Sequence, residues 1–294
     1  MAVTLKRLVL LLLAAATVTC SRPHRIVIGS KNFTESDLLA EIVAQQIERR
    51  TGGGIPVERR LHLGGTFVCH QAITTGAIDL YIEYTGTAFT AILKQPPIAD
   101  ADSVLRFVKA AYERQFQLRW TAPFGFNNTF AILVRHADAT RYHLATISDL
   151  ARVAPRWKAG FGYEFLERAD GFAGLARVYG LRFSQPPTAM DLGLTTRALA
   201  DGKVDVIAGN STDGQVAALD LVQLADDRGY FPPYQAAPVI RSAVLERYPT
   251  VAAALAELGG KISDSEMRRL NALADVEHRD IADIAREWLA NRLP

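Results

Sequence analysis

The stretch Asp79-Leu80-Tyr81-Ile82-Glu83-Tyr84-Thr85-Gly86-Thr87 decides how the rest of the chain is interpreted. In it, a short apolar strand runs into two tyrosines, a carboxylate and a Thr-Gly-Thr turn. Ligand pockets of α/β proteins form where strands end and glycine-containing turns follow. An ordinary core strand with half-buried tyrosines fits the same pattern, so the choice depends on the segments around it.

Strand and helix patterns alternate on both sides of this stretch. Strands are expected at residues 26–28, 57–63, 78–82, 131–134, 157–161, 204–208 and 239–240. The first helix is expected to begin at residue 34 and to stop near Thr51-Gly52-Gly53-Gly54. Further helices are expected at residues 66–73, 102–115, 171–179, 188–201 and 213–220, followed by helices alone at 244–257, 263–274 and 277–292. Such alternation predicts an α/β protein whose mostly parallel sheets are covered by helices on both faces.

Two of these helices carry recognisable start signals. Thr34 is expected to be the N-cap of the first helix, with Asp37 three residues later completing a capping box. Thr66, after a Gly-Gly pair, is expected to be the N-cap of the second.

Polar groups gather at the expected strand exits and helix starts. They occur in five places: Ser30-Lys31-Asn32, Gly64-Gly65-Thr66, Tyr84 to Thr87, Asn127-Asn128-Thr129 and Asn210-Ser211-Thr212-Asp213. Helix capping explains any one of them, because N-terminal backbone N–H groups need acceptors. Their repetition along an α/β chain indicates a binding cleft with several helix N-termini directed into it.

The N-terminal sequence is typical of an export signal. Lys6 and Arg7 precede the apolar run Leu8 to Ala16, which is shorter than a spanning helix. Residues 1–20 are therefore expected to be a signal peptide. Cys20 lies where bacterial lipoproteins carry their lipidated cysteine, although Thr19 stands where Gly or Ala is usual. We expect an exported chain, periplasmic or anchored by lipid on the outer face of the cytoplasmic membrane.

Composition excludes several classes of function. A formal net charge of +2 argues against a nucleic-acid footprint. The six histidines never occur at metal-ligand spacing, and Cys69 is the one cysteine left after processing. No nucleophile elbow, P-loop or dinucleotide fingerprint is present. We expect no enzyme activity, no cofactor, no metal and no nucleic-acid partner. Cys69 is expected to be a small core residue, and Asp79 and Glu83 to be structural rather than an acid/base pair.

The aromatic residues outside the regular elements point to a ligand. Tyr84, Phe126, Phe130 and Tyr234 fall at strand edges or in Gly/Pro/Asn-rich loops. Aromatic faces around a cavity attract cations, above all quaternary ammonium groups. Lys31 and Arg168 could meet a carboxylate on the same ligand, Arg168 in bidentate fashion. Solvated surface charges are the alternative for both residues.

With these groups in place, a family resemblance is evident. The segments that carry it are Gly29-Ser30-Lys31-Asn32-Phe33-Thr34-Glu35, Leu63-Gly64-Gly65-Thr66, Asp79 to Thr87, Asn127-Asn128-Thr129-Phe130, Arg168-Ala169-Asp170-Gly171, Ser211-Thr212-Asp213 and Phe231-Pro232-Pro233-Tyr234. In this order, over nearly the whole mature chain, they resemble the glycine betaine/choline/carnitine (osmoprotectant) substrate-binding proteins of ABC transporters. The resemblance implies a two-lobed periplasmic-binding-protein fold of type II that delivers its ligand to a permease with an ATPase.

The resemblance also implies a ligand site. In the family a cage of aromatics, commonly four tyrosines, holds the quaternary ammonium group. Tyr84 and Tyr234 match two cage positions, Phe130 replaces a third tyrosine and keeps its π-face, and Asn210 falls where the fourth is expected. Thr87 matches a contact to the polar end of the ligand, and Lys31 and Arg168 match positions associated with its carboxylate. The expected ligand-binding set is Lys31, Asn32, Tyr84, Thr87, Asn128, Phe130, Arg168, Asn210 and Tyr234.

The expected organisation is one discontinuous lobe and one continuous lobe. Residues 25–127 and 236–294 form lobe 1 and residues 128–235 form lobe 2, with the ligand between them. We expect a monomer that binds a quaternary amine or betaine. Three alternatives stay open: a different, more polar ligand such as an ergothioneine-like betaine, a sensor without transport, and an enzyme on the same scaffold.

Overall fold

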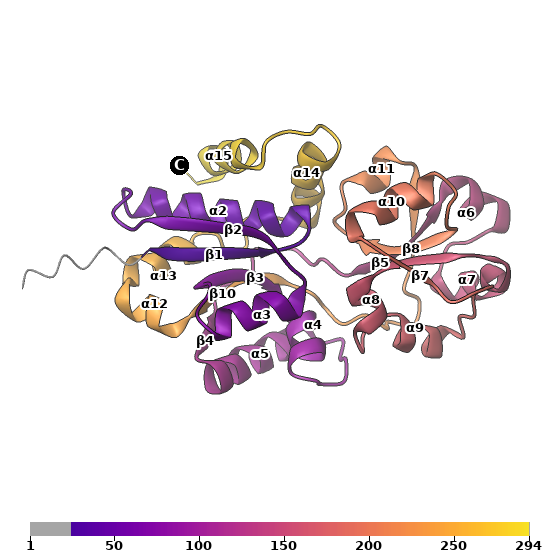
Figure 1. The fold of residues 1–294 in the computed structure, drawn as a ribbon, viewed down its shortest axis with the longest axis horizontal. Helices are drawn as coiled ribbons and strands as arrows, with labels where there is room; N and C mark the ends of the chain where they lie inside the picture. Colours follow the sequence, from indigo (N-terminus) through magenta and orange to yellow (C-terminus); the bar gives the residue numbers. More distant parts are fainter. Residues whose placement is uncertain (1–24, 294) are drawn as a thin grey trace, which may run out of the picture.

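Two five-stranded sheets, each flanked by helices, make up the structure, a computed structural model that describes residues 25–293 (Figure 1). The expected signal peptide and Cys20 lie outside the described residues. Within residues 25–293, the helices are too short or too polar for any of them to span a bilayer.

The first sheet has the strand order β2-β1-β3-β10-β4. Its strands are β1 (Ile26–Lys31), β2 (Val57–Gly64), β3 (Leu80–Tyr84), β4 (Leu118–Trp120) and β10 (Ala236–Arg241). The helices of the same lobe are α2 (Thr34–Arg50), α3 (Thr66–Thr74), α4 (Thr85–Thr87), α5 (Ala101–Phe116), α12 (Ser242–Arg247), α13 (Pro249–Ala256), α14 (Asp264–Asp275) and α15 (Ile281–Arg292), with a π-helical turn at Ala88–Ile92. Helices α2 and α15 lie on one side of this sheet and α3 and α5 on the other (Figure 1).

The second sheet has the order β7-β6-β8-β5-β9. Its strands are β5 (Phe130–Arg135), β6 (Ala159–Gly162), β7 (Thr188–Met190), β8 (Val206–Asn210) and β9 (Leu221–Leu224). Its helices are α6 (His136–Tyr142), α7 (Ile147–Val153), α8 (Tyr163–Glu167), α9 (Phe172–Tyr179), α10 (Leu192–Ala200) and α11 (Gln215–Ala218), with a 3₁₀ turn at Ala154–Arg156.

Both sheets are mixed, which corrects the expectation of mostly parallel sheets. In the first, β1 pairs in parallel with β2 and β3, whereas β10 runs antiparallel to β3 and β4. In the second, β6 pairs in parallel with β7 and β8, whereas β5 runs antiparallel to β8 and β9. Strands β5 and β10 are those that enter a sheet from the other lobe, so the local strand–helix alternation does not determine their direction.

The strands of the first sheet have continuous apolar sequences because both faces of the sheet are buried. On β1, Ile26 and Ile28 pack into one core cluster with α2, and Val27 between them packs into the cluster on the opposite face. On β3, Ile82 and Tyr81 divide in the same way. Each fully buried aliphatic side chain contributes about 1.5–3 kcal/mol, so neither face could be left uncovered.

The chain passes between the sheets twice, and the two passages pair with each other. Asn127 and Gln235 form an antiparallel bridge, and the Asn128 N–H donates to the Tyr234 carbonyl at 3.0 Å. The Tyr234 N–H in turn donates to Asn127 Oδ1 at 2.6 Å. Because the two crossing segments are bonded to each other, the residues next to them lie where the two lobes meet.

Candidate functional site in the cleft between the lobes

A cavity of about 400 Å³ lies between the two lobes. All nine residues of the expected ligand-binding set line it: Lys31, Asn32, Tyr84, Thr87, Asn128, Phe130, Arg168, Asn210 and Tyr234. Its volume falls in the range of small-molecule sites, roughly 300–1,000 Å³.

Strand ends deliver most of these side chains. Lys31 ends β1, Tyr84 ends β3 and Asn210 ends β8, while Phe130 begins β5. Strand β3 passes directly into α4, so Thr87 lies in the first helical turn after Tyr84 rather than in an open turn. Strand ends meeting at a cleft are the usual place for ligands in α/β folds.

The apolar part of the wall is an aromatic cluster centred on Phe130. Its ring lies 5.8 Å from the Tyr234 ring at an interplanar angle of 74°, and 4.9 Å from the Phe165 ring. Phe33 lies 6.1 Å from the Tyr84 ring. Phe33 and Phe165 line the cavity but were missing from the expected set, although Phe33 stands within one of the quoted segments. Phe126 does not belong here, since it is buried beside Phe124 in the core of lobe 1.

Buried carboxylates fix the hydroxyl groups of Tyr84 and Tyr234, two of the three tyrosines that line the cavity. Tyr84 donates to Glu35 Oε1 at 2.7 Å, and Tyr234 donates to Asp170 Oδ2 at 2.6 Å. Burial and the neighbouring carboxylates raise the pKa of each tyrosine well above its ordinary value, so both stay neutral donors. A phenol that donates to a carboxylate has a fixed ring plane and a more electron-rich face, which suits a cationic group.

Glu35 is a buried junction that the sequence did not reveal. Its carboxylate accepts from Tyr84, from Asn128 Nδ2 at 2.8 Å, from Thr212 Oγ1 at 2.5 Å and from Asn271 Nδ2 at 2.9 Å. Burial raises the pKa of Glu35, although the four hydrogen bonds oppose that shift. Thr212 follows β8 of the second sheet, and Asn128 lies in a crossing segment. The hydrogen bonds of Glu35 therefore connect the two lobes.

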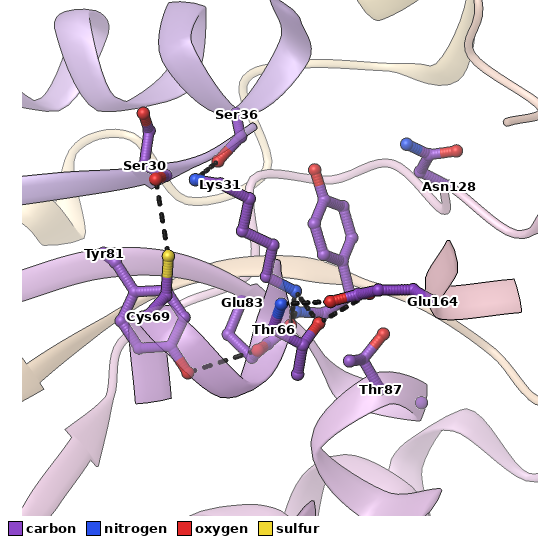
Figure 2. Close-up of polar contacts among 12 residues, drawn as sticks. Ser30, Lys31, Ser36, Thr66, Cys69, Tyr81, Glu83, Thr87, Asn128 and Glu164 are labelled. Atoms are coloured by element: carbon purple, nitrogen blue, oxygen red, sulfur yellow. Dashed lines mark hydrogen bonds and ion pairs between the residues drawn. The ribbon is translucent and has the colours of Figure 1, made fainter. Parts of the chain in front are cut away.

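Lys31 reaches the cavity wall with its charge already paired. Its Nζ donates to Glu83 Oε1 at 2.5 Å and to Thr66 Oγ1 at 2.9 Å (Figure 2). The same Nζ lies 5.2 Å from the centroid of the Tyr84 ring. Glu83 is fully buried and also accepts from Tyr81 Oη at 3.1 Å. Lys31 therefore stands in an internal ion pair rather than as a free anchor for a carboxylate.

Arg168 is paired in the same way. Its Nε and Nη2 donate to the two oxygens of Asp170 at 2.9 and 2.6 Å, and Nη2 also donates to Thr87 Oγ1 at 3.1 Å. Burial alone would raise the pKa of Asp170, but the Arg168 charge and hydrogen bonds from Arg168, Tyr234 and Thr90 hold it below its ordinary value. The guanidinium lies over the Phe130 ring at 4.9 Å, so it closes one side of the aromatic cluster.

Glu164 crosses the cleft from lobe 2. It belongs to α8, and it accepts hydrogen bonds from the backbone N–H of Thr66 and, at 3.1 Å, from Thr66 Oγ1 at the start of α3 (Figure 2). The N-cap of α3 is Gly65, which has no side chain to supply this bond, so a carboxylate of the other lobe supplies it. This corrects the expectation that Thr66 itself is the N-cap. Thr34 is likewise the first residue of α2 rather than its cap, and it donates to Asp275 Oδ1 at 2.6 Å.

The other candidates have structural roles. Cys69 is buried in α3, its thiol directed at the Ser30 carbonyl oxygen 3.3 Å away, and burial raises its pKa to about 12 (Figure 2). Asp79 accepts from the Val27 N–H at 3.0 Å and pairs with Arg241 at 3.3 Å. Among residues 25–293, no group of three or more His, Cys, Asp or Glu side chains is placed to hold a metal ion.

Two α/β lobes with an aromatic and polar cleft between them define a solute-binding protein of the periplasmic-binding class. Within that class, residues 24–291 match the family model described as the substrate-binding domain of ABC-type glycine betaine transport systems. The chain belongs to this family, which is a family of transport binding proteins.

Known relatives agree with this assignment. A carnitine transport binding protein of Listeria monocytogenes serotype 1/2a is 35% identical over 271 residues, covering 92% of this chain and 87% of the relative. An ergothioneine transport permease/ergothioneine binding protein of Helicobacter pylori is 35% identical over 265 residues, which is 90% of this chain but 47% of that relative, so the chain spans about half its length. A crystal structure described as a glycine betaine/carnitine/choline ABC transporter is 34% identical with a TM-score of 0.75, over 90% of this chain and 98% of the other.

Proposed function

We propose that this chain is the extracytoplasmic solute-binding component of an ABC importer and that it holds a quaternary-ammonium solute in the cavity between its lobes. The observation that supports this most is the pair of tyrosines, Tyr84 and Tyr234, whose hydroxyls are tied to buried carboxylates, with the Phe130 ring beside Tyr234. A quaternary ammonium group accepts no hydrogen bonds and donates none, so π-faces and nearby negative charge are what can recognise it.

The roles of the nine cavity residues follow from this proposal. Tyr84, Phe130 and Tyr234 supply the π-faces, while Thr87, Asn32 and Asn128 supply polar contacts. Lys31 and Arg168 stabilise the cavity wall through their ion pairs with Glu83 and Asp170. They can donate to the polar end of the solute only through N–H groups that are not already bonded to these carboxylates.

A larger, more polar betaine is the second candidate ligand. Asn210 stands beside Phe130 in the pairing of β8 with β5, so the wall is polar where a fourth aromatic would close it. An amide there can hydrogen-bond a ring N–H or a hydroxyl that a small betaine lacks. The Helicobacter relative that is described as binding ergothioneine gives this candidate a precedent.

Delivery requires partners and a location outside the cytoplasm. We propose a permease and an ATPase as partners, a monomeric binding protein, and export by the N-terminal signal with or without lipid on Cys20. We also propose that the lobes divide at 127/128 and 235/236, which the bridge between Asn127 and Gln235 supports.

A thermal-shift screen of the mature chain tests the function. The panel contains choline, glycine betaine, carnitine, proline betaine and ergothioneine, with glycine as a primary-amine control. At a ligand concentration of 100 Kd, binding to the folded state adds about 2.7 kcal/mol of stability, so a true ligand raises Tm by several degrees. No shift with any member of the panel would overturn the proposal, and a shift with ergothioneine alone would favour the second candidate.

A further inference from the structure

We propose that Glu164 makes the cleft selective for quaternary-ammonium ligands that carry a net positive charge and no carboxylate. This inference rests on the proposed function and narrows it from quaternary ammonium solutes in general to cations of the choline type. It depends on where the Glu164 carboxylate lies and on the charges around it.

Glu164 occupies the place that suits an anionic end of a ligand. The start of α3 offers a backbone N–H and the Thr66 hydroxyl, both of which donate to Glu164. Lys31 supports the same hydroxyl from behind at 2.9 Å, and Arg168 Nη1 lies 3.5 Å from Glu164 Oε2. The helix N-terminus, a lysine and an arginine thus converge on one carboxylate, and the protein itself provides it.

The charges around the cavity leave a negative excess. Lys31 and Arg168 are the two cations of this cluster, and each is already paired with a fully buried carboxylate, Glu83 or Asp170. Glu164 is the carboxylate nearest to these two pairs, and Glu167 and Asp191 also line the cavity, so the negative charges outnumber the two cations. A ligand with a quaternary ammonium group and no carboxylate balances this excess, whereas the carboxylate of a zwitterion would meet Glu164 as a like charge in a partly desolvated cleft.

Space at the start of α3 is also limited. A Cβ added at Gly65 would meet the carboxylate end of the Glu164 side chain, which would have to shift away from the start of α3. At this contact lobe 2 provides the carboxylate of Glu164, and lobe 1 provides a glycine, Gly65, whose missing side chain leaves room for it.

The test compares choline with glycine betaine by isothermal titration calorimetry on the wild-type chain, Glu164→Gln and the control variant Glu246→Gln. We expect wild-type protein to bind choline at least tenfold more tightly than glycine betaine. Glu164→Gln keeps the side-chain volume and removes the charge, so the ratio of the two affinities should fall at least tenfold. Glu246→Gln removes the same charge from an exposed position on α12, outside the cavity wall, and should change the ratio less than threefold.

Because both ligands are measured on the same protein, a general weakening of lobe closure cancels from the ratio. If both ligands bind and Glu164→Gln leaves the ratio unchanged, the role of Glu164 is overturned while the proposed function stands. Wild-type protein that prefers glycine betaine overturns the inference as well. If neither choline nor any other quaternary ammonium solute binds the wild-type protein, the proposed function fails and this inference fails with it.

Discussion

At the scale of single residues, Tyr84 shows most clearly how the site works. It was recognisable in the sequence as the end of a strand, and the structure places its ring in the cavity wall and its hydroxyl on Glu35. The two functions of the side chain, a π-face and a hydrogen-bond donor, can be separated by substitution.

We expect Tyr84→Leu, which keeps an apolar side chain but removes the ring, to weaken binding of a quaternary ammonium ligand about tenfold, within the 0.5–2 kcal/mol typical of cation–π attraction. Tyr84→Phe keeps the ring and should change affinity less than about threefold. Calorimetry on the two variants measures this difference. Equal loss in both would contradict a π-face role and would indicate that the hydroxyl is what matters.

Residue types could be predicted from the sequence, but their partners could not. The nine expected side chains do line one cavity, because strand ends and helix starts in an α/β chain share an edge. The pairing of Lys31 with Glu83 and of Arg168 with Asp170 was not visible, since the sequence shows a charge but not its neighbour. Glu164 was missed for the same reason: its partner, Thr66, belongs to the other lobe.

At the scale of elements, α2 carries the junction between the lobes at its first turn. Glu35 lies where an acidic residue at a helix start usually faces solvent, yet it is 3% exposed and accepts hydrogen bonds from four different segments. A glutamate in the first turn of a helix has no sequence pattern that shows whether it is buried. The sequence therefore predicted only the start of a helix at Glu35.

Glu35→Ala should lower the free energy of unfolding by about 3 kcal/mol or more, because it leaves several buried donors without an acceptor. The exposed Glu246→Ala on α12 is the matched control and should stay within about 0.5 kcal/mol of wild type. Chemical denaturation of both variants measures the two free energies of unfolding. A Glu35→Ala protein as stable as the control would show that the junction is not structural.

The start of α11 should make stability depend on pH. Burial, together with the charges of Asp275 and Glu35, raises the pKa of Asp213 to about 6. A raised carboxyl pKa favours the protonated form in the folded state, so its contribution to stability is present below about pH 4, where the unfolded carboxyl titrates, and is lost as pH rises to about 6.

Asp213→Asn removes that dependence and can still accept from the Gln215 N–H, which now bonds Asp213 Oδ1 at 2.8 Å. Because the side chain is half-buried, solvent screening leaves a gain of about 1–2 kcal/mol over wild type at pH 7, and none near pH 4. Thermal unfolding of both proteins at the two pH values measures the gain. An equal difference at both would rule out Asp213 as its source.

The order of elements was largely predictable, whereas their pairing was not. Seven strands were expected from apolar runs, and β4, β7 and β9, of three or four residues each, were missed. The expected helix at 188–201 is strand β7 followed by α10, and the expected helix at 244–257 is interrupted between Arg247 and Pro249. A proline is accepted at a helix start and not inside a helix, which explains the second difference.

At the scale of the whole molecule, three features connect the lobes: the two crossing segments, the Glu35 junction and the contact between Glu164 and Thr66. The bound solute would be enclosed between these features, with the aromatic cluster against its cationic end. The central claim is therefore that the cavity recognises the charge of a quaternary ammonium group and not merely its shape.

Titration calorimetry with choline and with 3,3-dimethyl-1-butanol tests this claim most directly, because the two molecules share a shape and differ in charge. Cation–π attraction and the carboxylates behind the tyrosines act only on the charged molecule. We predict that choline binds at least tenfold more tightly than the neutral analogue on the wild-type chain. Equal affinity for the two, or binding of the neutral analogue alone, would contradict the account.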